Sequence, residues 1–135
     1  MDKIEYGFGK LLNLPYAEAV ELTRAALKEQ GFGILTEIDM KQTLKEKRGV
    51  DFPPYLILGA CNPPLAHQAL TAELEVGLLL PCNVIVYEQG EGSVVKILDP
   101  VLAMEVIGNP ALAPIAHEAK ERLQKALDSL PGVKA

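Results

Sequence analysis

Apolar positions recur along the chain with two periods, and each period predicts a different kind of element. Where apolar residues alternate with polar ones, or run on for about four to eight positions, they predict strands. The first such stretch holds Ile4, Tyr6 and Phe8. Four more follow, over 32–38, 55–61, 83–88 and 93–99. In the stretch 32–38, the alternation predicts that one face carries Phe32, Ile34, Thr36 and Ile38.

Apolar residues spaced by three and four positions predict two long helices. The first begins at Pro15, a residue that suits the first helical position, and ends at Gly31. Its predicted inner stripe comprises Ala19, Leu22, Thr23 and Ala26. The second begins near Pro114 after a turn, and its predicted buried residues are Leu112, Ile115, Ala116, Ala119, Leu123, Ala126, Leu127 and Leu130. The remaining residues, PGVKA, predict a frayed tail.

Two shorter helices are predicted from their caps. Asp39 can accept a hydrogen bond from the backbone that opens a helix, and Gly49 closes that helix. Asn62 is placed in the same way before another helix, with Pro63 at its first position. The segment PVLAMEVIGNP (100–110) has no clear period and is expected to form an irregular connection with one helical turn.

The order of the elements predicts the fold class. The glycines of EQGEG, at 88–92, suit a hairpin between the last two strands, which excludes a purely parallel sheet. A chain of 135 residues suits a single domain. We therefore predict one α+β domain over 1–135, with a mainly antiparallel sheet of about five strands and two long helices packed on one face.

Composition narrows the functional classes. The net charge of −5 argues against a nucleic-acid partner, because phosphate binding needs a basic surface. No apolar run approaches the length of a membrane span, and the amino-terminal residues lack the apolar centre of a signal peptide. These observations predict a cytoplasmic location without membrane association. In that compartment the two cysteines are expected to be free thiols.

The two cysteines occur in the same dipeptide, Cys61-Asn62 and Cys82-Asn83. Cys61 ends one predicted strand and Cys82 begins the next. If only the helix after Asn62 joined these strands, they would be parallel and the thiols would lie at opposite ends. If the segment 73–80 runs back, the strands are antiparallel and both thiols lie at the same edge of the sheet.

Two interpretations of these cysteines concern the thiols themselves. They can be small apolar side chains in a core, with the asparagines as caps. They can also form a soft-metal or redox site, because Cys61 precedes a helix amino terminus, which favours the thiolate. His67 follows one turn into that helix. Two thiolates and an imidazole suit zinc or cuprous copper, so the metal candidates are Cys61, Cys82 and His67.

A third interpretation is a pocket at the strand ends, where a few polar groups orient a mostly apolar small molecule. The candidate ligand-binding residues are Cys61, Asn62, His67, Glu73, Cys82, Asn83 and Asp99. No nucleophilic triad or phosphate-binding loop is present, so no catalytic residue is named. We expect a module that binds a small ligand or a soft metal. The alternatives are a thiol-dependent enzyme or redox protein using Cys61, and a purely structural or partner-binding domain.

The segments GACNPPLA (59–66), LLPCNV (79–84) and DPVLAMEVIGNPALAPIA (99–116) closely resemble the domain-of-unknown-function 302 family, and the likeness extends over nearly the whole chain. The resemblance implies a fold like that of the TATA-binding protein: a strand, a helix, four antiparallel strands and a final helix. This meander favours the antiparallel arrangement of the two cysteine-bearing strands. The resemblance also implies a homodimer, and it supplies no biochemical activity.

The strands themselves also predict self-association. Residues 55–61 contain no charged side chain and 84–86 are apolar on both faces, whereas a strand with one face in water alternates. If both long helices pack on one face, the other face remains an apolar patch that 101–108 covers only in part. We therefore expect a homodimer that buries this patch against its own copy.

Overall fold

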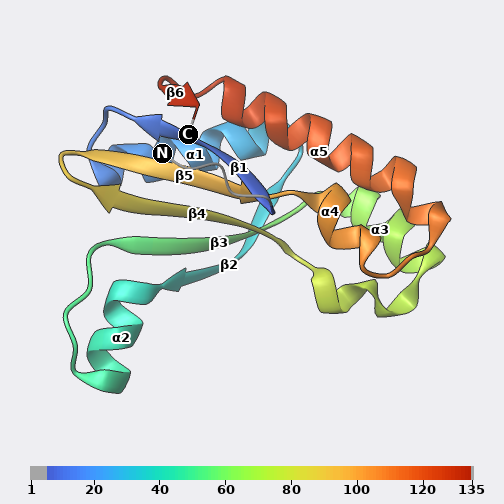
Figure 1. The fold of residues 1–135 in the computed structure, drawn as a ribbon, viewed down its shortest axis with the longest axis horizontal. Coiled ribbons are helices and arrows are strands. Elements are labelled where there is room, and N and C mark those ends of the chain that lie inside the picture. Colours follow the sequence, from blue (N-terminus) through green and yellow to red (C-terminus); the bar gives the residue numbers. More distant parts are fainter. Residues whose placement is uncertain (1–5, 135) are drawn as a thin grey trace.

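The structure is a computed structural model that describes residues 6–134, and it contains one sheet with its helices on one face and beyond its ends (Figure 1). The strands are β1 (Gly7–Leu12), β2 (Gly33–Asp39), β3 (Tyr55–Cys61), β4 (Cys82–Gln89), β5 (Gly92–Leu98) and β6 (Val133–Lys134). They lie in the order β2-β3-β4-β5-β1-β6, and every pairing is antiparallel. The predicted α+β class with a mainly antiparallel sheet is confirmed.

Two long helices and several short ones accompany the sheet. The long helices are α1 (Tyr16–Glu29) and α5 (Ala113–Asp128), which lie together on one side of the sheet (Figure 1). The shorter elements are α2 (Met40–Arg48), α3 (Pro63–Ala72), α4 (Pro100–Glu105) and the 3₁₀ helices η1 (Leu74–Leu79) and η2 (Pro110–Leu112). Among the described residues, none of these helices has the length and apolar character needed to span a bilayer.

The main core lies between the sheet and the two long helices. Its buried residues are Leu12, Ala19, Val20, Ala26, Leu27, Phe32, Leu56, Leu58, Ala60, Cys82, Val84, Val86, Val95, Ile97, Leu123, Ala126, Leu127 and Leu130. Alternate residues of the strands supply the sheet side of this list, as the period of two requires. On α1 the predicted stripe is buried except for Leu22, which is exposed, and Val20 and Leu27 complete the buried face.

One charged side chain crosses the main core. Lys10 of β1 is buried, and its ammonium donates hydrogen bonds to the carbonyls of Leu127, Asp128 and Leu130 at the end of α5. The last carbonyls of a helix have no N–H partner four residues further on and carry its partial negative charge. Lys10 therefore caps α5 and fixes its end to the first strand.

β2 departs from the predicted alternation. Its register against β3 shifts between Ile34 and Thr36, where a β-bulge inserts one extra residue. Ile34 lies opposite Ala60 of the main core, whereas Thr36 lies opposite Gly59 on the other face of the sheet. The prediction that the alternate residues of 32–38 share one face is therefore wrong, because a shift of one residue moves the rest of a strand to the opposite face.

Both ends of the described chain also differ from the prediction. The first strand begins at Gly7; Ile4 lies outside the described residues, and Tyr6 is exposed just before the strand. Near the other end, Val133 pairs with Leu11, so the tail that was predicted to fray forms a short edge strand. The pairing satisfies backbone groups of β1 that β5 does not reach.

The predicted caps of the helices are confirmed. Asp39 accepts a hydrogen bond of 3.0 Å from the backbone N–H of Gln42 at the start of α2. Gly31 and Gly49 follow α1 and α2 with φ of 86° and 65°, a region that glycine adopts without strain. α5 begins at Ala113, and η2 forms the predicted turn before it.

A second, smaller apolar cluster lies beyond one end of the sheet. This end cluster consists of the buried residues Ala69, Val76, Met104, Leu112 and Ala116. They come from α3, η1, α4, η2 and the start of α5. Figure 1 shows α3 and α4 at the opposite end of the molecule from α2. The end cluster therefore extends the hydrophobic interior past the strands, into a region built only of short helices and one end of α5.

Candidate functional site

The two cysteines lie at the same end of the sheet. β3 and β4 are antiparallel neighbours, and Ala60 lies directly opposite Cys82. Cys61 is the next residue of β3, so the two cysteines occupy adjoining positions of neighbouring strands, and their side chains leave the sheet on opposite faces. The chain reaches this arrangement because α3 carries it away from the sheet and η1 brings it back. Of the two arrangements that the sequence left open, the chain adopts the antiparallel one.

A small cavity of about 40 Å³ lies beside these cysteines. Cys61, Asn62 and Cys82 form part of its wall, and the rest comes from Phe32 and from residues of α3, α4, α5 and the end of η1. The other wall residues are apolar. A cavity of this size holds a water molecule or a group of a few heavy atoms, whereas a drug-sized ligand needs roughly 300 Å³ or more.

The cavity is placed where the two hydrophobic clusters meet. Its wall draws on the main core through Phe32, Ala60 and Cys82, and on the end cluster through Ala69, Met104 and Ala116. The strands stop here and the short helices begin, so neither regular strand pairing nor regular helix packing continues across the boundary. The space remains because side chains from two differently ordered layers do not interlock completely.

Both thiols are held in the neutral form. Burial, together with a smaller effect of the nearby Cys61, raises the pKa of Cys82 to about 11. Burial also raises the pKa of the Cys61 thiol, which is half-buried. The sequence suggested that a helix amino terminus would favour a Cys61 thiolate, and the structure gives the opposite direction.

The start of α3 explains why its amino terminus does not stabilise a thiolate through hydrogen bonds. Pro63 and Pro64 occupy the first two helical positions and have no N–H group. The next N–H, of Leu65, donates to the side-chain Oδ1 of Asn62 at 3.3 Å, and that of Ala66 donates to the Asn62 carbonyl. The free donors that usually make a helix terminus an anion site are therefore missing or occupied.

Two of the predicted site residues are exposed and lie outside the cavity wall. His67 is on α3, but its neighbours on the helix, not its imidazole, face the cavity. Asn83 is on β4 opposite Gly59, on the face away from the main core. Within residues 6–134, no group of three or more histidine, cysteine, aspartate or glutamate side chains is arranged to hold a metal ion. His67 is therefore not placed to complete a site with the two thiols.

The two predicted carboxylates each have a structural partner. Glu73 accepts a hydrogen bond of 3.2 Å from the side-chain amide of Asn109, which joins α3 to the start of η2. Asp99 caps α4 and forms an ion pair of 2.8 Å with Lys120 of α5. Neither carboxylate lines the cavity. Three of the seven predicted site residues are thus brought together, and four lie elsewhere.

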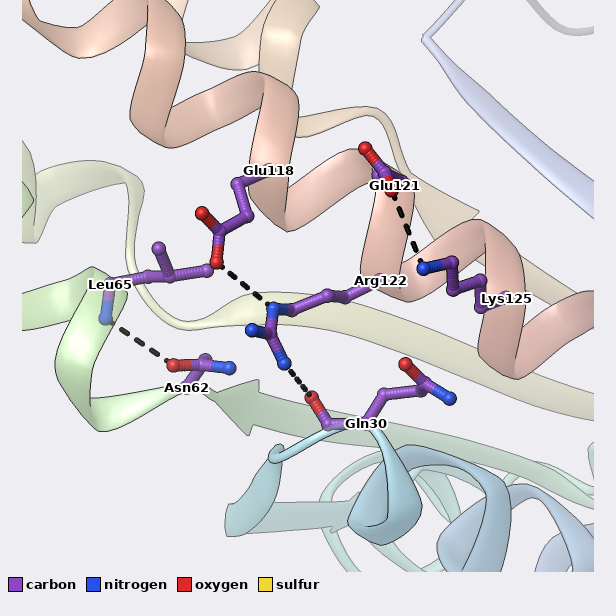
Figure 2. Close-up of polar contacts among 7 residues, drawn as sticks. All are labelled: Gln30, Asn62, Leu65, Glu118, Glu121, Arg122 and Lys125. Atoms are coloured by element: carbon purple, nitrogen blue, oxygen red, sulfur yellow. Dashed lines mark hydrogen bonds and ion pairs between the residues drawn. The ribbon is translucent and has the colours of Figure 1, made fainter.

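Asn62 caps α3 and lies beside an arginine that joins α5 to the end of α1. It is buried, and Figure 2 shows it beside Arg122 of α5, which lies between Glu118 and Gln30. Arg122 forms an ion pair of 3.1 Å with Glu118 and donates a hydrogen bond of 3.5 Å to the Gln30 carbonyl at the end of α1. These contacts join α5 to the end of α1 beside the start of α3.

Met104 was not predicted as a site residue, although it lines the cavity opposite the strand ends. It lies on α4, within the segment whose sequence showed no clear period. The sequence offered only one indication of this residue: sulfur-bearing side chains are few, with two cysteines and three methionines in the chain, and their soft sulfur atoms favour similar surroundings.

Comparisons with known proteins agree with this architecture. A family model described as "Domain of unknown function DUF302" matches residues 8–130. The chain belongs to the DUF302 family. A crystal structure of an uncharacterized conserved DUF302 protein from Bacillus stearothermophilus matches with 32% sequence identity and a TM-score of 0.85. The match covers 93% of this chain and 98% of the other. No curated protein matches this DUF302 chain.

Proposed function

We propose that this DUF302 domain is a binding module without catalytic activity, and that its site is the cavity beside Cys61 and Cys82. The observation that supports this is the cavity itself, whose wall is apolar apart from the residues Cys61, Asn62 and Cys82. Binding sites for small molecules have this composition, with few polar groups among many apolar ones. A space of about 40 Å³ restricts the bound part to a small group or a single ion.

The same geometry argues against a thiol-dependent enzyme. A nucleophilic cysteine needs a lowered pKa or an adjacent base, and burial raises the pKa of both thiols here. No histidine, aspartate or glutamate of the described chain lines the cavity to act as that base. A binding role therefore requires fewer additional assumptions than a catalytic one.

The proposed location is the cytoplasm. Both cysteines are free, and two free thiols in neighbouring strands suit a reducing compartment. Fractionation of native cells should recover the protein with the cytoplasmic fraction. Recovery with an extracellular or envelope fraction would contradict this location.

A cavity-filling variant tests the binding module. Ala66 of α3 lines the cavity and is half-buried, so Ala66→Leu should fill it, while the exposed Ala25→Leu on α1 is the matched control. The probes are xenon, short alkanes and dimethyl sulfide, and two-dimensional NMR maps the amide shifts. We expect shifts around Cys61 and Met104 in the native chain and in Ala25→Leu. They should disappear in Ala66→Leu; equal shifts in both variants would contradict the site.

We also propose that the domain forms a homodimer through the second face of its sheet. Ile57 of β3 lies opposite Ile85 of β4, and the rings of Tyr55 and Tyr87 stack at 5.4 Å on the same face. These four side chains are only half-buried. Figure 1 shows both long helices on the other side of the sheet. An apolar centre on an uncovered sheet face is a common dimer surface.

The two edges of the sheet favour this face over edge pairing. β2 carries the bulge, and its Glu37 pairs with Arg24, while β6 is only two residues long. Bulges, charges and short strands are features that discourage pairing between sheet edges. Two copies are therefore expected to meet face to face rather than extend the sheet.

Sedimentation velocity measures this self-association. The native chain should sediment at twice its 14.6 kDa mass at micromolar concentration. Ile85→Glu puts a charge at the centre of the proposed interface and should give a monomer, whereas Ala25→Glu on α1, on the opposite side of the sheet, should not. A native monomer, or a dimer that withstands Ile85→Glu, would contradict the interface.

A further inference from the structure

A second pocket, of about 240 Å³, lies between α4 and the start of α5, which are side by side in Figure 1. It is separate from the cavity beside the cysteines, with which it shares only Met104 and Ala116. Several of its wall residues are exposed, so the pocket is open to solvent. The rest of its wall consists of Val101, Glu105, Gly108, Asn109, Pro110, Leu112, Ala113 and His117.

The pocket exists because two helices face each other across short side chains. The wall residues of the two helices are Val101, Met104 and Glu105 on α4, and Ala113, Ala116 and His117 on α5. Both sets follow the spacing of three and four positions that places side chains on one face of a helix. Two of the three positions on α5 are alanines, whose side chains are too short to fill the space between the helices.

The wall contains one carboxylate, that of Glu105, and no lysine or arginine. Within residues 6–134, the Glu105 side chain has no hydrogen-bond or ion-pair partner. The side-chain amide of Asn109, by contrast, already donates to the Ala72 carbonyl and to Glu73. Glu105 can therefore pair with a ligand without losing an existing contact.

The charge of this end of the molecule favours a cation. The segments 63–81 and 100–117, which build it, contain no lysine or arginine and three carboxylates, those of Glu73, Glu75 and Glu105. The first lysine beyond them on α5, Lys120, is held by Asp99 at 2.8 Å. A surface with charges of one sign concentrates ligands of the opposite sign and repels those of its own. An ammonium group is therefore favoured here over a carboxylate.

We propose that the pocket between α4 and α5 binds a primary alkylammonium ion, that is, a protonated amine on a short aliphatic chain. The Glu105 carboxylate attracts the ammonium, and the chain lies along the apolar wall that Met104, Leu112 and Ala116 provide. At roughly 30 Å³ for each water-sized group, the pocket holds on the order of eight such groups. A chain of five or six carbons with its amine is of this size. The site is distinct from the cavity of the proposed function and does not depend on it.

The same wall disfavours an inorganic cation. Calcium and magnesium need several oxygen ligands, whereas the pocket offers a single free carboxylate. No group of three or more histidine, cysteine, aspartate or glutamate side chains in the described part of the chain is arranged to hold a metal. An organic cation needs only one polar contact, because its chain gains from the apolar residues beside it.

The test compares three probes with the same chain and different heads: hexylamine, hexan-1-ol and hexanoate. Two-dimensional NMR follows the amide shifts at low salt and about pH 8, where an alkylamine, like a lysine side chain, is protonated. Hexylamine should shift the amides of Gly108, Ala113 and His117 with a Kd on the order of millimolar. Hexan-1-ol should bind more weakly, and hexanoate about tenfold more weakly than the amine.

Two substitutions separate the Glu105 carboxylate from the general charge of this end. Glu105→Gln keeps the shape of the side chain and should weaken hexylamine binding about threefold, as the loss of an exposed ion pair does. The affinity for hexan-1-ol should stay unchanged. Glu75→Gln removes the same charge from the same end but lies outside the pocket wall, so its effect on hexylamine should be smaller.

A pocket-filling variant tests the place of the chain. Ala113 is exposed and lines the pocket, so Ala113→Leu should fold, which circular dichroism checks, and should abolish the shifts of all three probes. Ala111→Leu is the matched control, because Ala111 is an exposed neighbour outside the wall. If Ala113→Leu does not fold, the comparison of Glu105→Gln with Glu75→Gln still decides the question.

Three results would overturn the inference. Hexanoate binding as tightly as hexylamine would exclude a site for cations, and equal effects of Glu105→Gln and Glu75→Gln would remove the carboxylate contact. Hexylamine shifts that persist in Ala113→Leu, or that are confined to Cys61 and Cys82, would place the chain elsewhere. The xenon and dimethyl sulfide shifts, and their loss in Ala66→Leu, report separately on the cavity beside the cysteines, so failure of one site leaves the other standing.

Discussion

The main core and the end cluster bury apolar side chains in two different ways. The main core lies between regular elements: strands whose backbones pair along their length, and two helices of fourteen and sixteen residues. The end cluster lies between short helices and turns, and its outer surface leaves Leu74 and Leu78 of η1 81% and 85% exposed. The main core is covered by regularly repeating strand and helix positions, whereas the end cluster is covered by a few individual side chains.

The comparison shows where a binding space arises in a small domain. A cavity inside the main core would cost stability, because paired strands and long helices cannot move to fill it. At the boundary with the end cluster, side chains of strands and long helices meet side chains of short helices, and the spacings of the two sets do not match. Cys82 belongs to the main core and Met104 to the end cluster, and the cavity lies between them.

The largest expected difference between the two regions is in the cost of removing a leucine. Leu58→Ala in the main core should lower the free energy of unfolding by about 3–5 kcal/mol, because neighbouring strands cannot collapse on the space. Leu112→Ala in the end cluster should cost about 2–3 kcal/mol, because η2 is short and can shift inward. Urea denaturation followed by circular dichroism measures both. Equal costs would mean that the end cluster is as rigid as the sheet.

A smaller effect is expected from alkaline pH at the boundary between the regions. The pKa of Cys82 rises from 9.0 to about 11 on folding, so the folded chain holds this proton more tightly than the unfolded chain. The resulting stabilisation is complete below pH 9 and is lost as the pH rises towards 11, amounting to about 2 kcal/mol. Urea denaturation at pH 7.5 to 11 should show this loss in the native chain.

Cys82→Ala is the control for that experiment, because it keeps every other titrating group. Its free energy of unfolding should fall less over the same pH range. If the two proteins lose stability in parallel, Cys82 is not the group responsible, and its thiol is more open to water than the packing indicates.

The smallest expected effect concerns the outer surface of the end cluster. Leu78→Ser should change the free energy of unfolding by no more than about 0.5 kcal/mol, as exposed substitutions usually do. Thermal unfolding at two protein concentrations measures it. A loss above about 1 kcal/mol that grows with concentration would show that another copy covers η1, and the end cluster would then be half of a larger interface.

The main core could be predicted from the sequence because the apolar residues of its helices and strands recur at regular spacings. The buried residues of α5 recur every three or four positions, and β3, β4 and β5 are short apolar stretches separated by turn and helix signals. Caps such as Asp39 and Asn62 fixed helix starts within a residue, because each makes a local hydrogen bond to the backbone that follows. Local chemistry and a constant period suffice for such elements.

The rest depends on contacts between residues far apart in the chain. The bulge in β2 reflects its pairing with β3, and no residue within β2 predicts its position. That Met104 lines the same cavity as the two cysteines depends on where α4 lies after the sheet has formed. His67, by contrast, had the right sequence spacing from Cys61 and the wrong side of the helix. Spacing alone does not tell which face of a short helix meets a neighbour.

The position of β1 has a consequence for how the chain is made. This strand is synthesised before both of its neighbours, β5 and β6, and before the carbonyls at the end of α5 that the Lys10 ammonium contacts. At synthesis rates of about 5–20 residues per second, β1 stays without these partners for several seconds. A nascent chain halted before residue 127 should therefore leave its first strand open to proteases and to chaperones. The packing of β1 is therefore complete only after α5 and β6 have been synthesised.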